Sequence, residues 1–588
     1  MHHVPTMDYL TLAEAYEKIE ATRSRLEMAD LLVELLRQVP VDEVEMVILL
    51  TQGKLAPDFK GVEMGIAEKL ALKAIYEATR VNETEIQKLW LRDGDLGNVA
   101  FEAVSRKKQT SLFTEHLSVK MVFRNLEQIA GSSGAGSQDM KLKLLAKMMH
   151  DSSPVEAKYI ARTLAGKLRL GIADMTLIDA LAIAYASKEE RDAIERAYNT
   201  CSDLARVATI LAGDGLGGLE NIKLEVGIPL RAMLAERLPG IPEILEKLGG
   251  KCAFEYKYDG LRIQAHIRKD KIQLFTRQLE DVTGQFPDLV EILGKSFKGK
   301  AAVLEGECVP VDINTGEMLP FQTVSKRRGR KYELTSAVTE YPVMLYLFDC
   351  LYLEGGDLTQ TPYTNRRKML KKCIKETERV KLAEVLITDD AEEAEEYFRK
   401  VIGKGGEGIM AKSLAPDSYY RAGSRGWNWI KFKRDYKSEM NDTVDLVVVG
   451  AFSGKGRRAG NYGALLMATY NPERGIFETV TKLGSGFDDA MLALLPELLD
   501  THKTDKVHRL VDSKMQADYW FEPSVVLEVK GAEITLSPIH TCGWELVRKN
   551  SGLAIRFPRY TGKVRQDKPA EEATSTDEML AMYEMQAK

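Results

Sequence analysis

The order of apolar and polar residues divides the chain into a helical first part, a mixed middle part and a strand-rich last part. Apolar residues recur at helical spacing in residues 26–36 and 140–149, which is typical of amphipathic helices. The middle part alternates short apolar runs of strand character with helical signals, whereas short strands and glycine turns dominate the last part. The pattern therefore predicts three domains, which cover residues 1–228, 229–436 and 437–588.

Polar and aromatic residues that could take part in catalysis or binding end the apolar runs of the middle part or share one face of a predicted strand. They are Lys257, Glu305, Glu307, Phe348, Glu407, Lys431 and Lys433. Strand ends and the loops after them are where catalytic side chains tend to be displayed. An aromatic ring for a base, carboxylates for a metal ion and cations for phosphates would together form a nucleotide pocket.

Lys257 stands just before a turn at Asp259-Gly260 and is the candidate nucleophile. A lysine attacks phosphorus only as the neutral amine, and its ordinary pKa is about 10.4, so burial or a neighbouring cation must lower that pKa. Arg262 is the candidate for the neighbouring cation. A solvated strand and turn would explain Lys-x-Asp-Gly equally well, and it is the order of the segments after it that favours the nucleophile.

In this order the segments resemble the motifs of the covalent nucleotidyltransferases, and most closely those of ATP-dependent DNA ligases of the archaeal and eukaryotic replicative type. Residues 257–262 resemble the nucleotidylation motif. The other matching segments are residues 275–277, 304–307, 348, 407–408, 431–433 and 564–568. The resemblance extends over nearly the whole chain.

The resemblance implies a role for each residue of the site. Lys257 would carry AMP, while Glu255 and Phe348 would hold the adenine. Glu307 and Glu407 would serve the ribose and a Mg²⁺ or Mn²⁺ ion. The remaining cations would hold phosphates: Arg262, Arg277, Arg425, Lys431 and Lys433.

The resemblance also implies a reaction and three folds. The expected activity is ATP-dependent sealing of 5′-phosphate/3′-hydroxyl nicks in duplex DNA, through lysyl-AMP and an adenylylated DNA intermediate, in replication, repair and recombination. The expected folds are an all-α DNA-binding domain, an α+β nucleotidyltransferase (adenylation) domain and a C-terminal β-barrel of the OB type. We expect a monomer, and the sequence leaves open whether ADP, GTP or NAD can replace ATP.

Basic segments outside the pocket indicate where DNA would be held. Lys167 and Arg169 lie in a segment that resembles the DNA-binding domain of the family. The basic runs 326–331 and 454–458 are expected against phosphates, with a solvated loop as the alternative for the first. Residues 564–568 resemble a motif that orients pyrophosphate during self-adenylation.

A short segment of the helical part suggests a protein partner. Gln109, Leu112 and Phe113 resemble a short form of the motif that docks on the DNA sliding clamp, in which apolar anchors supply affinity and an amide fixes orientation. The alternative is that Leu112 and Phe113 begin a core helix.

The N-terminus leaves the start of the native protein open, because translation could begin at Met1 or at Met7.

Composition limits the alternatives. The net charge of −5 does not indicate a nucleic-acid binder, but whole-chain charge says little when acids and bases are segregated. The six cysteines form no Cys-x-x-Cys pair, which disfavours zinc and an NAD-dependent ligase and suits the reducing cytoplasm. The sequence contains no apolar run of 18 residues, so it predicts no membrane-spanning helix. A capping enzyme or an RNA ligase would not need the long helical part, and a non-catalytic DNA clamp would not need the motifs.

Overall fold

The computed structural model groups the chain into two compact units. The first contains residues 1–87 and 96–433, and the second contains residues 434–588 with residues 88–95. The residues that the structure describes are 6–63, 66, 68–107, 115–134, 136–311, 318–319, 321–325, 327, 338, 341–433, 443–454, 461–531, 533–556 and 558–587.

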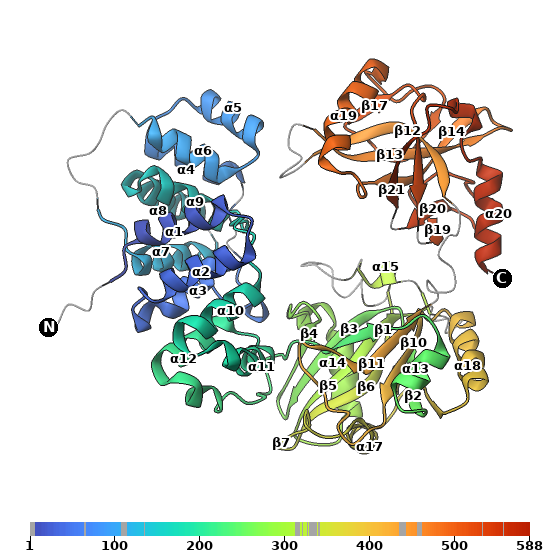
Figure 1. Ribbon diagram of the computed structural model, residues 1–588, viewed down its shortest axis with the longest axis horizontal. Coiled ribbons are helices and arrows are strands. Elements are labelled where there is room, and N and C mark those ends of the chain that lie inside the picture. Colours follow the sequence, from blue (N-terminus) through green and yellow to red (C-terminus); the bar gives the residue numbers. More distant parts are fainter. Residues whose placement is uncertain are drawn as a thin grey trace. The chain divides into compact units, whose positions relative to one another are not determined.

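The part of the first unit before residue 220 is helical (Figure 1). Its helices are α1 (Tyr9–Ala21), α2 (Arg25–Leu36), α3 (Val44–Thr51), α4 (Glu68–Thr79), α5 (Glu83–Asp93, whose last residues belong to the second unit), α6 (Leu96–Ser105), α7 (Val119–Gly131), α8 (Ser137–Asp151), α9 (Pro154–Leu164), α10 (Asp174–Tyr185), α11 (Arg191–Cys201) and α12 (Leu204–Leu219). Their starts follow ordinary rules: α9 has Pro154 in its first turn, and Ser153 and Glu156 cap it reciprocally.

The helices hold together through apolar packing and through ion pairs, among them a partly buried cluster between α1 and α9. Glu20 accepts hydrogen bonds from Arg162 at 2.8 and 3.0 Å and from the Tyr159 hydroxyl at 2.7 Å, and it pairs with Lys158 at 2.9 Å. Burial alone would raise the pKa of Glu20, but these partners lower it to about 2. The cluster therefore keeps a charged carboxylate at the junction of two helices.

The rest of the first unit contains two antiparallel-rich sheets. The strands are β1 (Leu234–Arg237), β2 (Cys252–Lys257), β3 (Leu261–Arg268), β4 (Lys271–Thr276), β5 (Ala301–Pro310), β6 (Val343–Leu353), β7 (Gly356–Asp357), β8 (Val380–Leu382), β9 (Val385–Thr388), β10 (Gly408–Ser413) and β11 (Arg425–Lys433). One sheet has the order β1-β11-β10-β2-β9, and the other has the order β4-β3-β5-β6-β7 with β8 paired to β6.

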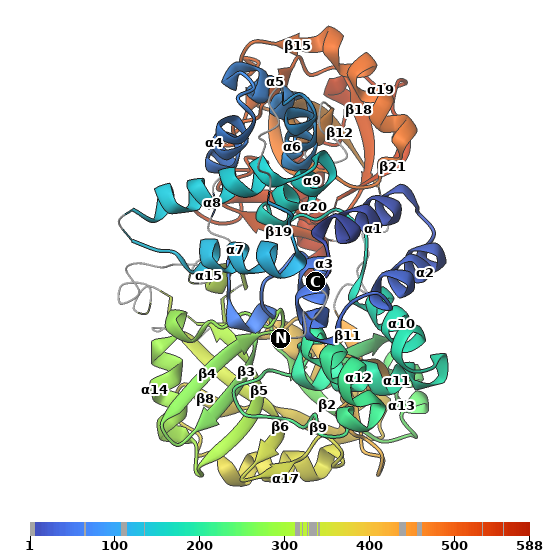
Figure 2. The same cartoon turned by 90° about the vertical axis from the view of Figure 1, so that its left-hand side faces the viewer.

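Helices pack on each of these sheets (Figures 1 and 2). They are α13 (Ile241–Lys247), α14 (Pro287–Ser296), α15 (Phe321–Ser325), α17 (Tyr363–Cys373) and α18 (Ala391–Gly403). The apolar residues of α14 and α17 form a core with β3, β5 and β6, while α18 contacts β2, β9 and β10. Strand β3 shows the reason for this layering, since Ile263 and Ala265 enter that core and the alternate residues Arg262 and Gln264 do not.

The second unit is rich in strands. They are β12 (Val444–Ser453), β13 (Tyr462–Asn471), β14 (Ile476–Leu483), β15 (Lys503–Thr504), β16 (Val511–Asp512), β17 (Tyr519–Phe521), β18 (Val526–Lys530), β19 (Glu533–Ser537), β20 (Gly552–Arg556) and β21 (Arg559–Val564), with helices α19 (Asp489–Leu499) and α20 (Thr576–Ala587). The main sheet has the order β15-β17-β12-β13-β14-β16, with β18 joining β12 to β21. Residues from both faces of β12 and β13 pack into two apolar clusters.

The predicted order of helical, mixed and strand-rich parts is confirmed, but two local expectations are wrong. Glu307 and Phe348 do not end their strands, because β5 continues to Pro310 and β6 to Leu353. A strand that faces a polar cavity carries polar residues within its length, so the apolar run is shorter than the strand. The six cysteines, all within the described residues, are buried free thiols. Among the described helices, none is long and apolar enough to cross a membrane.

Candidate active site

Three neighbouring strands of the β1–β9 sheet bring the candidate nucleophile and two lysines together. In the antiparallel register, Lys257 of β2 is opposite Gly408 of β10, which is opposite Lys433 of β11. One row further along, Glu255 of β2 and Lys431 of β11 are aligned across β10 in the same way. Because alternate residues of a strand point to the same face, these four side chains share one face of the sheet.

Two glycines allow the close backbone contacts behind this arrangement. A side chain at Gly408, where φ is +151°, would place its Cβ 2.2 Å from the carbonyl oxygen of Phe432. A side chain at Gly260 would place its Cβ 2.4 Å from the carbonyl oxygen of Cys308. The turn after Lys257 can therefore lie directly against β5 of the other sheet.

The other sheet contributes Arg262 and Glu307, which face each other on β3 and β5. Arg262 donates hydrogen bonds to Glu305 at 2.8 Å and to the carbonyl oxygen of Met233 at 2.9 Å. Burial opposes its charge, but Glu305 outweighs burial and raises the pKa of Arg262. Its guanidinium carbon lies 5.5 Å from the centre of the Phe348 ring. Arg262 is thus a fixed cation beside an aromatic side chain.

The two sheets line a common cavity of about 450 Å³, a size that suits a small-molecule ligand. All ten site residues expected from the sequence line it: Glu255, Lys257, Arg262, Arg277, Glu307, Phe348, Glu407, Arg425, Lys431 and Lys433. Arg277, directly after β4, and Arg425, at the start of β11, are the exposed members of this set.

Lys257 is an amine whose surroundings disfavour its charged form. Its ammonium group pairs with one oxygen of Glu407, whose other oxygen pairs with Lys433. Burial lowers the pKa of Lys257, and the positive charges of Arg262 and Arg277 lower it further, against the effect of Glu307. The expected influence of Arg262 is therefore present, although burial is the larger cause. A lysine with a lowered pKa is more readily converted to a nucleophile.

Glu307 lies in the same cavity, and its surroundings also disfavour its charged form. Burial raises the pKa of Glu307 to about 7, although Lys257 and Arg262 both act to lower it. A carboxylate held at this cost, beside Glu407 in one cavity, is suited to a cation that arrives with its ligand.

The far wall of the cavity contains residues that the sequence analysis did not assign. The rings of Phe348 and Trp429 meet edge to face, with 6.1 Å between their centres. Nζ of the buried Lys412 lies 4.3 Å from the centre of the Trp429 ring. Lys412 pairs with Glu255 at 2.7 Å, and Glu255 also accepts a hydrogen bond from the Tyr363 hydroxyl at 2.6 Å. Strand alternation was the available signal for Lys412, which follows the cavity residue Met410 by two positions.

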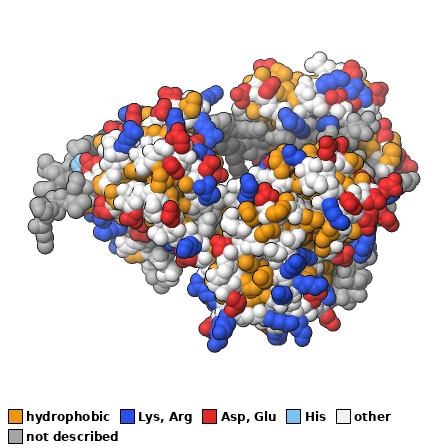
Figure 3. Space-filling view, turned by 60° about the horizontal axis from the view of Figure 1, so that its bottom comes forward, with side chains coloured by type: hydrophobic (Ala, Val, Ile, Leu, Met, Phe, Trp, Pro, Cys, Tyr) orange, Lys and Arg blue, Asp and Glu red, His pale blue; other side chains and the backbone are white. Residues whose placement is uncertain are grey.

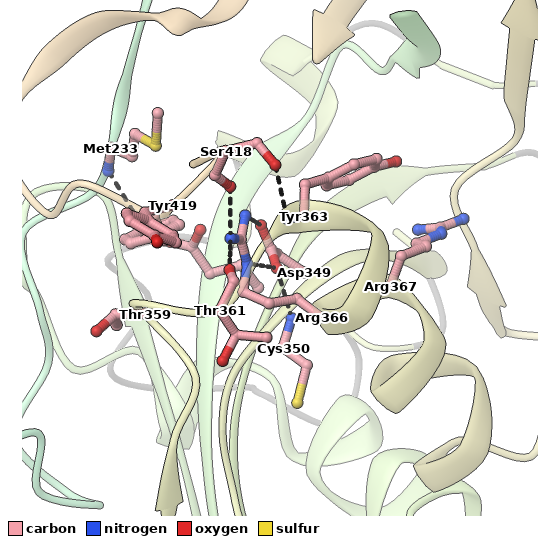
Figure 4. Close-up of polar contacts among 12 residues, drawn as sticks. Met233, Asp349, Cys350, Thr359, Thr361, Tyr363, Arg366, Arg367, Ser418 and Tyr419 are labelled. Carbon is pink, nitrogen blue, oxygen red and sulfur yellow. Dashed lines mark hydrogen bonds and ion pairs between the residues drawn. The ribbon is translucent and has the colours of Figure 1, made fainter. Parts of the chain in front are cut away.

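A buried ion pair supports this wall from behind (Figure 4). Arg366 of α17 donates to both oxygens of Asp349, at 2.8 and 3.0 Å, and to the carbonyl oxygens of Thr361 and Ser418 at 2.6 and 2.9 Å. Asp349 follows Phe348 directly on β6. Burial disfavours the charge of Asp349, but Arg366 outweighs this and lowers its pKa. The network ties β6, α17 and the segment after β10 together.

One basic residue expected on DNA lies in the protein interior instead. Arg327 is fully buried, pairs with Asp288 and lies 4.6 Å from the Phe286 ring. A run of cations usually indicates a solvated surface, but here residues about 40 positions earlier provide an acidic, aromatic pocket. The prediction of phosphate contact is therefore wrong for Arg327, and the other members of its basic run lie outside the described residues.

Other expected contact residues are placed as follows. Lys167 and Arg169 are exposed between α9 and α10, while the intervening Leu168 is buried. Arg565 and Lys568 pair with Asp445 at 2.6 and 2.7 Å within the second unit. The proposed clamp residues Gln109, Leu112 and Phe113, and residues 455–458, lie outside the described residues. On the face shown in Figure 3, acidic and basic side chains are interspersed.

Comparisons with known proteins find matches along nearly the whole chain. Three family models match: "DNA ligase N terminus" over residues 8–182, "ATP dependent DNA ligase domain" over 232–433 and "ATP dependent DNA ligase C terminal region" over 458–568. "DNA ligase 2" of Thermofilum pendens is 50% identical, and the match covers 99% of this chain and 98% of that protein. The "Probable DNA ligase" of Aquifex aeolicus is 47% identical, with 99% of each chain covered.

A comparison of folds adds a match to a solved structure over most of the chain. The solved structure titled "Pmar-Lig_Pre." matches 94% of this chain and 99% of its own with a TM-score of 0.53. At 17% sequence identity this match shows a shared fold alone. The family models and the full-length relatives, by contrast, share sequence along the helical, mixed and strand-rich parts. The chain therefore belongs to the family of ATP-dependent DNA ligases.

Proposed function

We propose that this ligase seals 5′-phosphate/3′-hydroxyl nicks in three displacements at phosphorus. In the first, Nζ of Lys257 bonds to the α-phosphorus of ATP and pyrophosphate leaves. In the second, an oxygen of the nick 5′ phosphate attacks the phosphorus of lysyl-AMP and the lysine leaves. In the third, the 3′ hydroxyl attacks the 5′ phosphorus and AMP leaves. Positioning and charge neutralisation supply most of the catalysis in such displacements.

The observation that carries this proposal is the position of Lys257. It is a half-buried amine with a lowered pKa in a cavity lined by further cations. Lys431 and Lys433 lie on neighbouring rows of the same sheet face, and Arg277 and Arg425 are exposed at the same cavity. These cations would neutralise the triphosphate, and Glu255 with Phe348 would hold the adenine.

A divalent metal ion fits this site, and we propose Mg²⁺ or Mn²⁺. Among the described residues, no three carboxylates, histidines or cysteines are grouped as a protein-only metal site. Glu307 and Glu407, however, supply two hard oxygen donors to one cavity, and Mg²⁺ is commonly held by one or two carboxylates together with substrate phosphates. When bound, the metal would neutralise phosphate charge. Until then, Lys257 and Lys433 neutralise Glu407.

We assign roles to the remaining parts from the sequence segments that resemble the family. Residues 1–228 would bind duplex DNA, with Lys167 and Arg169 on phosphates, residues 229–436 would be the adenylation domain, and residues 437–588 would be the OB-fold domain. Gln109, Leu112 and Phe113 would dock on the sliding clamp, and replacing both apolar anchors with alanine would abolish clamp pull-down while sparing basal sealing. In the cell, the proposed monomer would act in replication, repair and recombination.

A labelling and chase experiment tests the proposed intermediates. The full chain is mixed with ATP labelled at the α-phosphate, with Mg²⁺, and then chased with unlabelled ATP and nicked duplex. We expect the label to appear first on protein and then on the 5′ end of the nick, with release as AMP when the nick closes. Ligation without any covalently labelled protein would refute the proposed route.

A further inference from the structure

Tyr420 is a buried residue to which the reaction described above gives no role. It belongs to the segment between β10 and β11 and is only 1% exposed. Its ring meets the Trp429 ring edge to face, with 5.8 Å between the centres, and its backbone N–H donates to the carbonyl oxygen of Thr359 at 2.8 Å. Tyr420 is not among the residues that line the active-site cavity. An effect of its side chain on the reaction would therefore pass through another residue.

The hydroxyl of Tyr420 contacts Arg262 and also the two residues that accept the shorter hydrogen bonds of Arg262. It accepts a hydrogen bond from Arg262 at 3.4 Å. It accepts another from the backbone N–H of Met233 at 3.0 Å, and the carbonyl oxygen of Met233 accepts from Arg262 at 2.9 Å. The proton of the hydroxyl bonds to Glu305, the carboxylate that pairs with Arg262 at 2.8 Å. One oxygen atom thus joins Arg262 to both of its supports.

These contacts allow the hydroxyl only one orientation. A phenol has one O–H donor and two lone pairs. Its two lone pairs face N–H donors, so its proton can be directed only to the carboxylate of Glu305. Burial raises the pKa of Tyr420, and the charge of Glu305 raises it further. The hydroxyl therefore keeps its proton, and the group of contacts around Arg262 is fixed.

The position of Arg262 matters because Arg262, unlike Tyr420, lines the cavity. Its guanidinium carbon lies 5.5 and 5.4 Å from the centres of the Phe348 and Trp429 rings. It is opposite Glu307 in the pairing of β3 with β5. A cation that is already in place stabilises the charge that develops at phosphorus without reorganising during the reaction. A guanidinium that can move loses part of this effect.

We infer that Tyr420 is a positioning residue, whose hydroxyl fixes Arg262 for the attack on the α-phosphorus of ATP. It does so by holding Met233 and Glu305, which in turn hold the guanidinium. Because Tyr420 itself does not line the cavity, its hydroxyl affects the rate of the reaction more than the affinity for ATP. The inference rests on the proposed function, because it requires ATP to react in this cavity.

The variant Tyr420→Phe removes the hydroxyl oxygen and keeps the ring that packs on Trp429. Covalent labelling of the full chain at several concentrations of α-labelled ATP gives a maximal rate and a half-saturating concentration. We expect the maximal rate to fall by about tenfold, because a small misplacement of a group in an active site slows the reaction. The half-saturating concentration should change by less than about twofold, as for a contact that matters only in the transition state.

Tyr16→Phe is the matched control. Tyr16 is also fully buried, and its hydroxyl is hydrogen-bonded to Thr51 at 3.0 Å in the helical part. Both variants lose a buried hydroxyl, so both should melt at a lower temperature than the unmodified protein. Only Tyr420→Phe should be labelled more slowly. A role of Tyr420 in stability alone would make the two variants equal in labelling.

Crystal structures of the unmodified protein and of Tyr420→Phe test the position of Arg262 directly. In the variant, we expect the guanidinium to leave the carbonyl oxygen of Met233 or to occupy more than one orientation. An Arg262 that stays in place overturns the inference, and so does a maximal rate that is unchanged. A variant that does not fold also overturns it, because the hydroxyl would then serve the fold. Absence of labelling in the unmodified protein would instead refute the proposed function.

Discussion

At the scale of single residues, the site depends on two groups whose protonation the fold changes in opposite directions. Lys257 has a lowered pKa and Glu307 a raised one, both chiefly because they are buried. Each change shifts the group toward its neutral form. The fold thus holds groups that are costly to bury, which is common at functional sites.

Replacement of the nucleophile should separate the first step from the last. Lys257→Ala should abolish labelling by ATP and ligation from ATP, because no other amine replaces it. Lys257→Arg should not restore either activity, since a guanidinium stays protonated. Both variants should still close a nick that already carries 5′-AMP. Gel assays of labelled protein and of pre-adenylylated DNA measure these outcomes, and ATP-dependent labelling of either variant would contradict the assignment.

The raised pKa of Glu307 predicts a stability cost that depends on pH. The carboxyl group titrates near 4.5 when unfolded and at about 7 when folded, so folding favours its protonated form. The cost is absent below pH 4.5, grows as the pH rises and is complete above pH 7. Glu307→Gln should therefore raise the melting temperature at pH 8 by about 2–8 °C, at about 2–4 °C per kcal/mol, and by less toward pH 5.

The neighbouring Glu305→Gln is the control for that experiment. Glu305 lies two residues away on β5 and is paired with Arg262 at 2.8 Å, so its replacement should destabilise the protein at neutral pH. A melting temperature for Glu307→Gln at pH 8 that equals or falls below that of the unmodified protein would contradict the stated cost.

At the scale of elements, the base-binding wall is held by the junction of β6, α17 and the segment that precedes β11. The side chains of Asp349 and Arg366 that join them are almost completely buried, at 1% and 0% exposure. Removal of one partner of a buried pair leaves an uncompensated charge, whereas removal of both does not. The junction is therefore sensitive to single changes.

This sensitivity predicts a difference between single and double variants. Arg366→Met should lower the free energy of unfolding by about 3–5 kcal/mol, because Asp349 stays buried without its partner. Arg366→Met combined with Asp349→Leu should lose less than the single variant. Denaturant unfolding monitored by tryptophan fluorescence measures both. A double variant as unstable as the single one would show that the contacts of Arg366 with backbone carbonyls dominate.

The sequence predicted the chemistry of the site better than its supporting contacts. The place of Lys257 followed from an apolar run and a turn, both of which are local. Lys412 and Tyr363 were not assigned, because their contacts with Glu255 are tertiary: the pairing of β10 with β2 brings Lys412 there, and the packing of α17 brings Tyr363. The prediction for Arg327 was wrong because its burial also depends on a tertiary contact, the ion pair with Asp288, which is distant in the sequence.

At the scale of the whole molecule, the net charge of −5 hides where DNA would be held. Acidic and basic side chains are interspersed on the face shown in Figure 3, so the described residues of that face form no large surface of one sign. The exposed Lys167 and Arg169 flank the buried Leu168, which anchors their loop between α9 and α10. This arrangement presents two cations together.

Replacement of these two cations should weaken DNA binding without affecting the active site. The double variant Lys167→Ala with Arg169→Ala should bind nicked duplex less tightly. The slope of log K against log salt should flatten by about 0.9 for each lost phosphate contact. Fluorescence anisotropy at several salt concentrations measures the slope. Self-adenylation of the same sample is the control, and an equal loss of both activities would mean that the loop supports the fold instead.

The bridging position of Glu407 between Lys257 and Lys433 has a consequence for the direction of the proposed reaction. At rest, this trio carries one surplus positive charge, which favours the arrival of an anion. Attachment of AMP removes the charge of the lysine and adds a negative phosphoryl group, so the local balance reverses by two units. Pyrophosphate would then be attracted less strongly, with Lys431, Arg277 and Arg425 still in the cavity. The covalent step would thus lower the affinity of the site for the leaving anion and favour its release before DNA is engaged.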